Sequence, residues 1–316
     1  MLNHLMNASA ELTLENPFYV KALEAFVWGA FELDRLSGDA TSEALGPVGE
    51  SKAQIIAKES GQFAGLLELT WFLSRLKQEG LKIDMVATIA EGELFEKGRV
   101  LFEFSGASAH LLLVERTILN LLQRLCGIAT KTHLLQARLP NSIQLLATRK
   151  TLWGPLDKRA VALGGGGTHR LHLGDAILVK ENHISSAISS AAVLQCCNQS
   201  RQHSLRCILS VVFSRSDQVR FVEVELETLE QVQQFVDYAK GQSDLPANLV
   251  VMLDNFTLDQ IRSAVPLLKT VDVTIEVSGG VNEGNLTDYA IDGVDCISAG
   301  MLTNRAHAVD LSMQFV

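Results

Sequence analysis

The charged side chains that could do chemistry stand at the ends of short apolar runs. Arg149, Lys150 and Lys180 are among them and form a set of five cations together with His169 and Arg170, which follow a run of glycines. Arginine presents a planar fork of N–H donors that matches a carboxylate or phosphate, and lysine adds a point charge. The sequence neighbours of the set are glycines and apolar residues with few acids, so surface salt bridges explain it poorly. The pattern predicts a crevice that binds a small polyanion.

Two carboxylates, Glu225 and Asp254, also end neighbouring apolar runs. Paired carboxylates in a site that binds phosphate suggest Mg²⁺ held partly through water, or hydrogen bonds to sugar hydroxyls. The alternative is that both are buried structural acids. We favour a functional role because so many runs end at a reactive side chain.

Glycines accompany the charged residues. The run from Gly164 to Gly167 precedes His169, but it lacks the G-x-x-x-x-G-K-[ST] pattern of a phosphate loop. We therefore interpret it as backbone that permits positive φ and close packing. Further along the chain, 278–280 and 298–300 each close an apolar run with glycine. Loops after the last strands of an α/β barrel commonly bind phosphate through backbone N–H groups, so a phosphate site is predicted there.

These side chains must be positioned by an alternation of strands and helices. Near-continuous apolar strands between helical segments are typical of a parallel sheet covered on both faces, and six of them suggest a closed or nearly closed α/β barrel. Segment 207–213 is either a helix or an insertion, because the gap to the next strand is too short for a crossover. The six predicted strands are 142–148, 175–180, 221–226, 248–254, 271–278 and 296–300.

The first third of the chain has a different texture. Helical spacing of apolar residues covers 17–36 and 66–79, and alternation predicts strands at 51–58 and 98–105. This mixture predicts helices with an antiparallel sheet. A long helix is predicted over 115–139, with a possible break at Gly127.

Composition limits the classes of function. The 316 residues allow one large domain or two ordinary ones, and the net charge of −9 argues against a nucleic-acid or anionic-membrane surface. No apolar run reaches the roughly 18 residues of a membrane span, and the N-terminus does not resemble a signal peptide. The cysteines lack metal-ligand spacing, and we expect buried or free thiols in a cytoplasmic protein. They are Cys126, Cys196, Cys197, Cys207 and Cys296.

Taken together, the motifs resemble the quinolinate phosphoribosyltransferases, also called nicotinate-nucleotide pyrophosphorylases (carboxylating). The similar segments occur in the family's order over nearly the whole chain. They are SGDATSE (37–43), AKESGQFAGL (57–66), ERTILNLLQRLCGIATKT (115–132), ATRKT (147–151), GGGGTHR (164–170), DAILVKENHI (175–184), VEVELETLEQV (222–232), VMLDNF (251–256), EVSGGV (276–281) and GVDCISAGMLT (293–303).

The resemblance implies a fold and a reaction. It implies an N-terminal α/β sandwich domain over 1–117, with the tail 304–316 packing on it, and an incomplete parallel α/β barrel over 118–303. It further implies that quinolinate and phosphoribosyl pyrophosphate give nicotinate mononucleotide, pyrophosphate and CO₂, with Mg²⁺, in NAD biosynthesis. The expected assembly is a homodimer or a higher oligomer, with no nucleic acid or membrane as partner.

The resemblance also implies roles for residues. The five cations match the set that holds the quinolinate carboxylates, and Arg116 matches an arginine that reaches the partner subunit's site. Glu225 and Asp254 match the acids that meet ribose and Mg²⁺. The phosphate contacts match Ser278, Gly279 and Gly300.

The implied mechanism needs no general base, because the pyridine nitrogen already has a lone pair. Catalysis then consists of positioning and of stabilising the charge of the leaving pyrophosphate, with Glu225 and Asp254 taking part. Ring ribosylation makes the ring cationic, so that it accepts the electrons released as the C2 carboxylate leaves. Lys150 is our candidate for protonating that carbon.

Three departures from the family pattern, and two alternatives, accompany this assignment. The segment TRKTLWGPLDK is about two residues shorter than its family counterpart and lacks an arginine, Thr168 replaces an asparagine, and Asn304 replaces a histidine.

One alternative is a relative of the same fold with another acceptor, of the type associated with molybdenum transport; Lys180 argues against it. The other is a non-catalytic binding protein, which would need neither the cations nor the acidic pair.

Overall fold

The computed structural model describes residues 5–47, 49–187, 204–242 and 245–316, which form two compact units. The sandwich unit comprises Ser9–Gln136, Lys150–Gly166 and Leu302–Val316. The barrel unit comprises the described residues up to Ala8 together with Ala137–Arg149 and Gly167–Met301.

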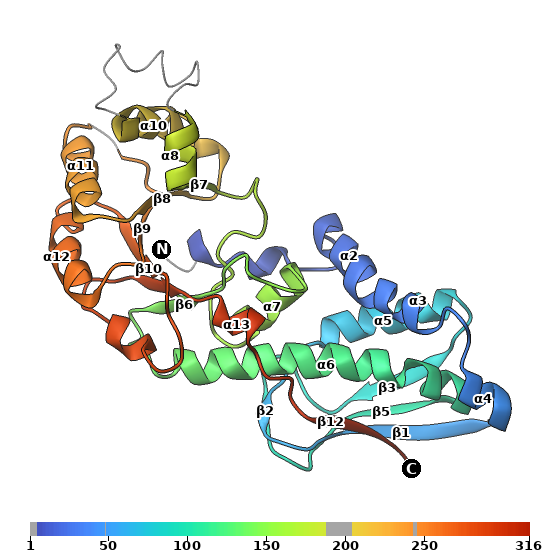
Figure 1. Ribbon diagram of the computed structural model, residues 1–316. Helices are drawn as coiled ribbons and strands as arrows, with labels where there is room; N and C mark the ends of the chain where they lie inside the picture. The colour runs from blue at the N-terminus through green and yellow to red at the C-terminus, as the bar shows by residue number, and fades with distance from the viewer. Residues whose placement is uncertain (1–4, 48, 188–203, 243–244) are drawn as a thin grey trace. The chain divides into compact units, whose positions relative to one another are not determined.

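The sandwich unit is built on an antiparallel sheet with strand order β12-β1-β5-β3 (Figure 1). In β1 (Glu50–Ala57) every second side chain is buried, as alternation predicted. β1 pairs with β5 (Val100–Ala107) on one side and with β12 (Leu311–Phe315) on the other, and β5 also pairs with β3 (Ile83–Ala87). A small second sheet joins β2 (Gly61–Gln62) to β4 (Leu94–Phe95).

One helix, α6 (Ser108–Gln136), runs unbroken through the sandwich unit. The predicted break at Gly127 is therefore wrong. Glycine is needed there for another reason: a Cβ atom would lie 1.9 Å from the carbonyl oxygen of His307, so the returning chain can cross the helix only where there is no side chain. The expected domain boundary at residue 117 falls inside α6, all of which belongs to the sandwich unit.

Helices occupy both segments of the sandwich unit in which the apolar spacing predicted them, 17–36 and 66–79. The first is one continuous run with a π-helical turn in its middle, and the second is α5. The elements are η1 (Ser9–Glu11), α2 (Pro17–Leu23), η2 (Glu24–Trp28), α3 (Gly29–Asp34), α4 (Ala40–Leu45), α5 (Leu66–Gln78) and α7 (Pro155–Leu163).

The barrel unit contains six parallel strands in the order β6-β11-β10-β9-β8-β7 (Figure 1). No pairing joins β6 to β7 among the described residues, so the sheet is open between its first and last strands. The predicted α/β fold, with an antiparallel sheet in one part and a parallel sheet in the other, is confirmed. The strands are β6 (Gln144–Leu146), β7 (Ile177–Val179), β8 (Val222–Leu226), β9 (Leu249–Asp254), β10 (Thr274–Ser278) and β11 (Cys296–Ser298).

Helices follow the strands. Thr228 and Thr257 begin α11 (Leu229–Lys240) and α12 (Leu258–Leu268) with reciprocal capping boxes, which satisfy backbone N–H groups at both helix starts. Segment 207–213 is helical, within α10 (Ser204–Phe213). The others are α8 (Glu181–Ala187), η4 (Ser216–Gln218) and η5 (Leu286–Tyr289), while α13 (Met301–Asn304) lies where the chain leaves the barrel unit.

The cysteines only partly follow expectation. Cys126 and Cys296 are buried free thiols, but Cys207 is disulfide-bonded, so the expectation of thiols throughout is wrong there. Cys196 and Cys197 lie outside the described residues. Within the described parts of the chain, none of the helices has both the length and the apolarity of a membrane span.

Candidate active site

The carboxyl ends of the barrel strands bring the two predicted carboxylates together with a third. Glu225 lies in β8 and Asp254 ends β9, the neighbouring strand. Ligand oxygens of Glu225, Glu227 and Asp254 all lie within 4.8 Å of one another. Glu225 is buried and pairs with the ammonium of Lys180, which follows β7. Burial and the neighbouring Glu181 raise the pKa of Glu227, as expected where acids crowd.

Two of the predicted cations interact in the barrel unit. Arg149 is exposed after β6, whereas Arg170 is 8 % exposed. Burial and the charge of Arg149 lower the pKa of Arg170, which means that the two guanidinium groups repel one another. Two guanidinium groups that repel one another favour a ligand that carries negative charge.

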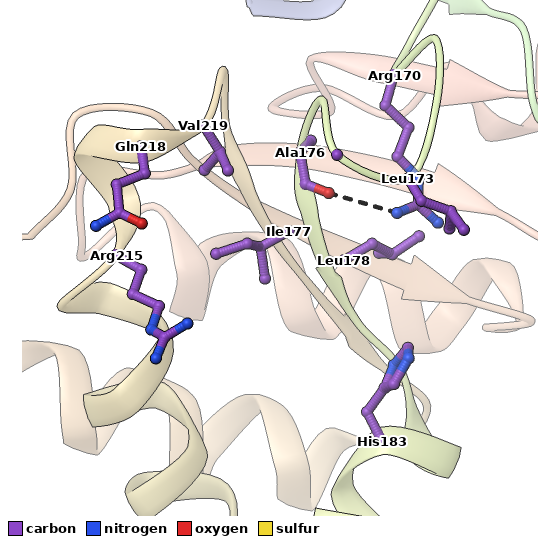
Figure 2. A pocket seen from close by; sticks show the side chains of 10 residues that line it. Arg170, Leu173, Ala176, Ile177, Leu178, His183, Arg215, Gln218 and Val219 are labelled. Carbon is purple, nitrogen blue, oxygen red and sulfur yellow. Dashed lines mark hydrogen bonds between the residues drawn. The ribbon is translucent and has the colours of Figure 1, made fainter. Parts of the chain in front are cut away.

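A cavity of about 380 Å³ opens beside Arg170. Figure 2 shows the Arg170 guanidinium pointing to the carbonyl oxygen of Ala176, which accepts a hydrogen bond at 3.4 Å, while His183 and Arg215 border the same space. Of the predicted substrate ligands, only Arg170 lines this cavity.

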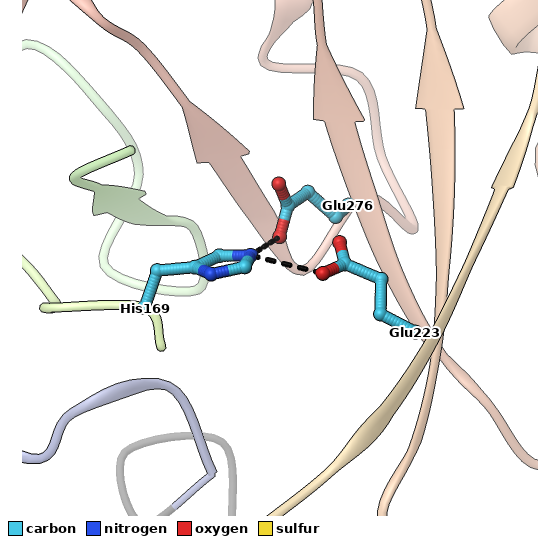
Figure 3. A group of neighbouring side chains, drawn as sticks. All are labelled: His169, Glu223 and Glu276. Atoms are coloured by element: carbon cyan, nitrogen blue, oxygen red, sulfur yellow. Dashed lines mark ion pairs between the residues drawn. The ribbon is translucent and has the colours of Figure 1, made fainter. Parts of the chain in front are cut away.

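His169 has an unusual backbone and an enclosed ring. Its φ of 52° lies in the left-handed region, and its ring is enclosed in the unit. Nε2 lies 3.1 Å from Oε2 of Glu223 and 3.4 Å from Oε2 of Glu276, as Figure 3 shows. Burial opposes a charge on the His169 ring, while the carboxylates of Glu223 and Glu276 favour a proton on the ring nitrogen that faces them. The sequence predicted that His169 would face substrate together with the other cations. In the structure its Nε2 faces Glu223 and Glu276.

The predicted phosphate loop at 278–280 contacts Asn255, the residue that follows β9. Gly279 has a φ of 90°, and a Cβ there would lie 2.7 Å from the backbone nitrogen of Asn255. Asn255 in turn donates its N–H to the carbonyl oxygen of Ser278 at 3.0 Å. Only glycine permits this close approach. Gly300 lies two residues after the end of β11 and directly before α13.

The glycine run 164–167 serves packing. A Cβ on Gly164 would lie 2.5 Å from the carbonyl oxygen of Ala129, within the sandwich unit. A Cβ on Gly167 would lie 2.5 Å from Cδ2 of Leu146, within the barrel unit. These contacts agree with the interpretation of the run as close-packed backbone.

Two predicted site residues, Lys150 and Arg116, belong to the sandwich unit. The Thr303 hydroxyl donates to the carbonyl oxygen of Lys150 at 2.8 Å. Arg116 is exposed on α6 and borders a cavity of about 420 Å³, beside Trp153.

Sequence reasoning missed Glu223, Glu276 and Glu227. The first could have been found from the V-E-V-E alternation of β8, because residues two apart on a strand share a face. Glu223 and Glu225 therefore point to the same side. Glu276 stands two residues before Ser278 in β10 and follows the same rule.

Known proteins of this architecture match nearly the whole chain. Residues 39–126 match the family model "Quinolinate phosphoribosyl transferase, N-terminal domain", and residues 128–314 match the C-terminal domain model. A probable nicotinate-nucleotide pyrophosphorylase (carboxylating) of Bacillus subtilis is 34 % identical, over 88 % of each chain. A Synechocystis protein with the same description is 33 % identical, over 100 % of this chain and 99 % of its own.

A solved structure has the same fold. The nicotinate-nucleotide pyrophosphorylase from Francisella tularensis superimposes with a TM-score of 0.78 at 29 % identity, covering 94 % of this chain and 96 % of that one.

Proposed function

Because this chain belongs to the quinolinate phosphoribosyltransferase family, we propose that it transfers phosphoribosyl from phosphoribosyl pyrophosphate to quinolinate. The products are nicotinate mononucleotide, pyrophosphate and CO₂, on the route to NAD. The enzyme is a pentosyltransferase. No observation favours the alternative acceptor or a purely binding role.

The observation that carries the proposal is the division of charge at the strand ends. The charges of Arg149 and Arg170 repel one another, and Glu225, Glu227 and Asp254 form a cluster in which Glu225 pairs with Lys180. Quinolinate is a dianion, which suits the arginines, and a ribose with its metal-bound pyrophosphate suits the acids.

We assign the division of labour as follows. Arg149, Lys150, Arg170 and Lys180 bind and orient quinolinate, with Arg116 supplied by a second subunit. Ser278, Gly279 and Gly300 hold phosphate through the loops after the last strands. Since the ring nitrogen attacks with its own lone pair, the chain contributes alignment and charge stabilisation. Lys150 donates the proton that replaces CO₂.

The residues present fit Mg²⁺. Glu225, Glu227 and Asp254 offer only oxygen donors, which hard divalent cations prefer. Glu225 and Asp254 would hold the ion, partly through water, and Glu227 adds a third carboxylate. When bound, the ion would stabilise the negative charge of the pyrophosphate leaving group.

We further propose a homodimer or higher oligomer with shared active sites, acting in the cytoplasm. Exposure of Arg116 on α6 supports the shared site, because an arginine at the surface can serve a neighbouring chain.

The test is to incubate the protein with quinolinate, phosphoribosyl pyrophosphate and Mg²⁺ and to detect nicotinate mononucleotide and CO₂. Nicotinate replaces quinolinate as the matched control. Quinolinate should be preferred by about 100-fold or more, because nicotinate leaves a buried cation unpaired, at a cost of several kcal/mol. Equal turnover of the two acids would contradict the assignment.

A further inference from the structure

Three titratable side chains meet inside the barrel unit, one step deeper than the strand ends that carry the proposed ligands. Glu223 precedes Glu225 by two residues in β8, and Glu276 precedes Ser278 by two residues in β10. Both carboxylates have no exposed surface, and His169 is 5 % exposed. Figure 3 shows Nε2 of His169 directed between the two carboxylates.

Nothing else in the described chain satisfies most of these carboxylate oxygens. Apart from His169, no described residue hydrogen-bonds to either oxygen of Glu223 or to Oε1 of Glu276, and Oε2 of Glu276 otherwise accepts only from the thiol of Cys296, at 3.9 Å. Buried carboxylates are costly unless they are paired. The His169 ring is thus the principal partner of both.

The bonding of the ring distinguishes a proton from a metal ion. A metal bound to Nε2 would require the ring proton on Nδ1, where a metal-bound histidine normally meets an acceptor. Here Nδ1 instead accepts the backbone N–H of Arg170 at 2.8 Å. Nδ1 therefore keeps its lone pair, and the ring proton is on Nε2, facing the carboxylates.

The same bond connects the cluster to a proposed substrate ligand. Nδ1 of the His169 ring accepts the backbone N–H of Arg170. The backbone N–H of His169 donates to the carbonyl oxygen of Met6 at 2.8 Å. The rings of Phe221 and His169 pack at right angles to one another, with centroids 5.2 Å apart. A left-handed backbone is unfavourable for a non-glycine residue and persists only where surrounding contacts fix it.

We infer that Glu223 and Glu276 are positioning residues. They hold Nε2 of the His169 ring inside the barrel unit, so that Nδ1 on the opposite edge of the ring fixes the backbone of Arg170. In this arrangement both ring nitrogens are engaged, and His169 acts through Arg170 without binding the substrate carboxylates. This inference rests on the proposed function only in that Arg170 binds quinolinate.

The first experiment reads the ring directly, without substrate. The protein is labelled with ¹⁵N-histidine, and the His169 signals are assigned by their loss in His169→Asn, because asparagine tolerates a left-handed backbone. We expect Nδ1 unprotonated and hydrogen-bonded, and Nε2 protonated, both unchanged by Zn²⁺ or by saturating quinolinate. A protonated Nδ1, or loss of the Nε2 proton on adding Zn²⁺ or quinolinate, would overturn the inference.

The second experiment is a double-mutant cycle on quinolinate affinity, measured by calorimetry. Glu223→Gln should raise the quinolinate Kd by about tenfold or more, because Arg170 loses its fixed position. In an Arg170→Ala background, Glu223→Gln should alter the quinolinate Kd by less than about twofold, because the side chain that His169 positions is already absent. The Kd for phosphoribosyl pyrophosphate with Mg²⁺ should stay within about twofold in Glu223→Gln.

Controls keep the outcomes distinct. Glu230→Gln, on the exposed first turn of α11, is the matched substitution and should bind quinolinate normally. Glu276→Gln replaces Glu223→Gln if the latter does not fold. Equal effects of Glu223→Gln with and without Arg170, or no effect at all, would overturn the inference. Failure of the wild type to bind quinolinate would instead contradict the proposed function, while the ring state could still be read by NMR.

Discussion

Arg124 and Asp157 form a bidentate ion pair, with Nε 2.8 Å from Oδ1 and Nη2 2.6 Å from Oδ2. Asp157 is completely buried, and its Oδ2 also accepts the backbone N–H groups of Leu152 and Trp153. The guanidinium of Arg124 lies over the Trp153 ring, 5.2 Å from its centroid. The segment that is shorter than its family counterpart is therefore tightly organised around one carboxylate.

This pair predicts a large effect of Asp157→Ala. The substitution leaves Arg124 without its buried partner and frees two backbone N–H groups, so the free energy of unfolding should fall by about 3–5 kcal/mol. Denaturant unfolding measures it. Asp259→Ala, at an exposed residue of α12, is the control and should change stability little. A loss for Asp157→Ala no larger than for the control would contradict the role of the pair.

The acidic cluster predicts a separation of the two substrates. Asp254→Ala should weaken binding of phosphoribosyl pyrophosphate with Mg²⁺ by about tenfold or more, because it removes an oxygen donor, and should leave quinolinate binding nearly unchanged. Calorimetry on each ligand separately provides the measurement. Glu227→Gln should reduce Mn²⁺ affinity, followed by electron paramagnetic resonance, more than Glu230→Gln. If quinolinate affinity falls instead, the division of the site is wrong.

A shared active site predicts recovery of activity in mixed dimers. Arg116→Ala and Lys180→Ala should each be almost inactive, whereas the two variants refolded together should regain activity. Random pairing puts about half of the molecules in mixed dimers with one intact site of two, so recovery should approach roughly a quarter of wild type. Subunit exchange is verified independently with a mass tag. Absence of recovery despite exchange would mean that Arg116 serves its own barrel.

The sandwich unit predicts a pH effect on stability at Glu68. This carboxyl is fully buried, accepts the hydroxyl of Tyr19 and pairs with Arg159 at 3.2 Å. Burial raises its pKa above 4.5, against the attraction of Arg159. A raised folded-state pKa contributes stability that is complete below the unfolded value and is lost as pH rises through the folded value.

The melting temperature of the wild type should therefore decline as pH rises above about 4.5. Glu68→Gln should reduce the dependence of the melting temperature on pH in that range. Thermal unfolding at a series of pH values measures the slope. Glu230→Gln, an exposed substitution of the same kind, should keep the wild-type slope. The same slope in Glu68→Gln would show that another group is responsible.

The sequence predicted the features that depend on local pattern. The six strands of the parallel sheet were visible because buried strands are short apolar runs, and Glu225 and Asp254 were visible because they end such runs. The sequence did not decide whether 207–213 is a helix or an insertion, because a short apolar run has no distinctive periodicity.

Features that depend on contacts between distant segments could not be predicted. Gly127 suggested a helix break because its partner, the carbonyl of His307, lies 180 residues further along the chain. Glu223 and Glu276 look like ordinary residues of apolar strands until their common contact with His169 is seen. The boundary predicted at residue 117 falls inside α6, and most helical stability in proteins comes from packing against other segments, which the sequence does not display.

The pairing of β12 with β1 has a consequence for synthesis on the ribosome. Ile55 faces Met313 across the strand pair, so the sandwich sheet has an unpaired edge until more than 250 further residues have been translated. During that interval β1 presents free N–H and C=O groups to any passing strand. The barrel strands emerge in the meantime, and the chain therefore closes its first sheet last.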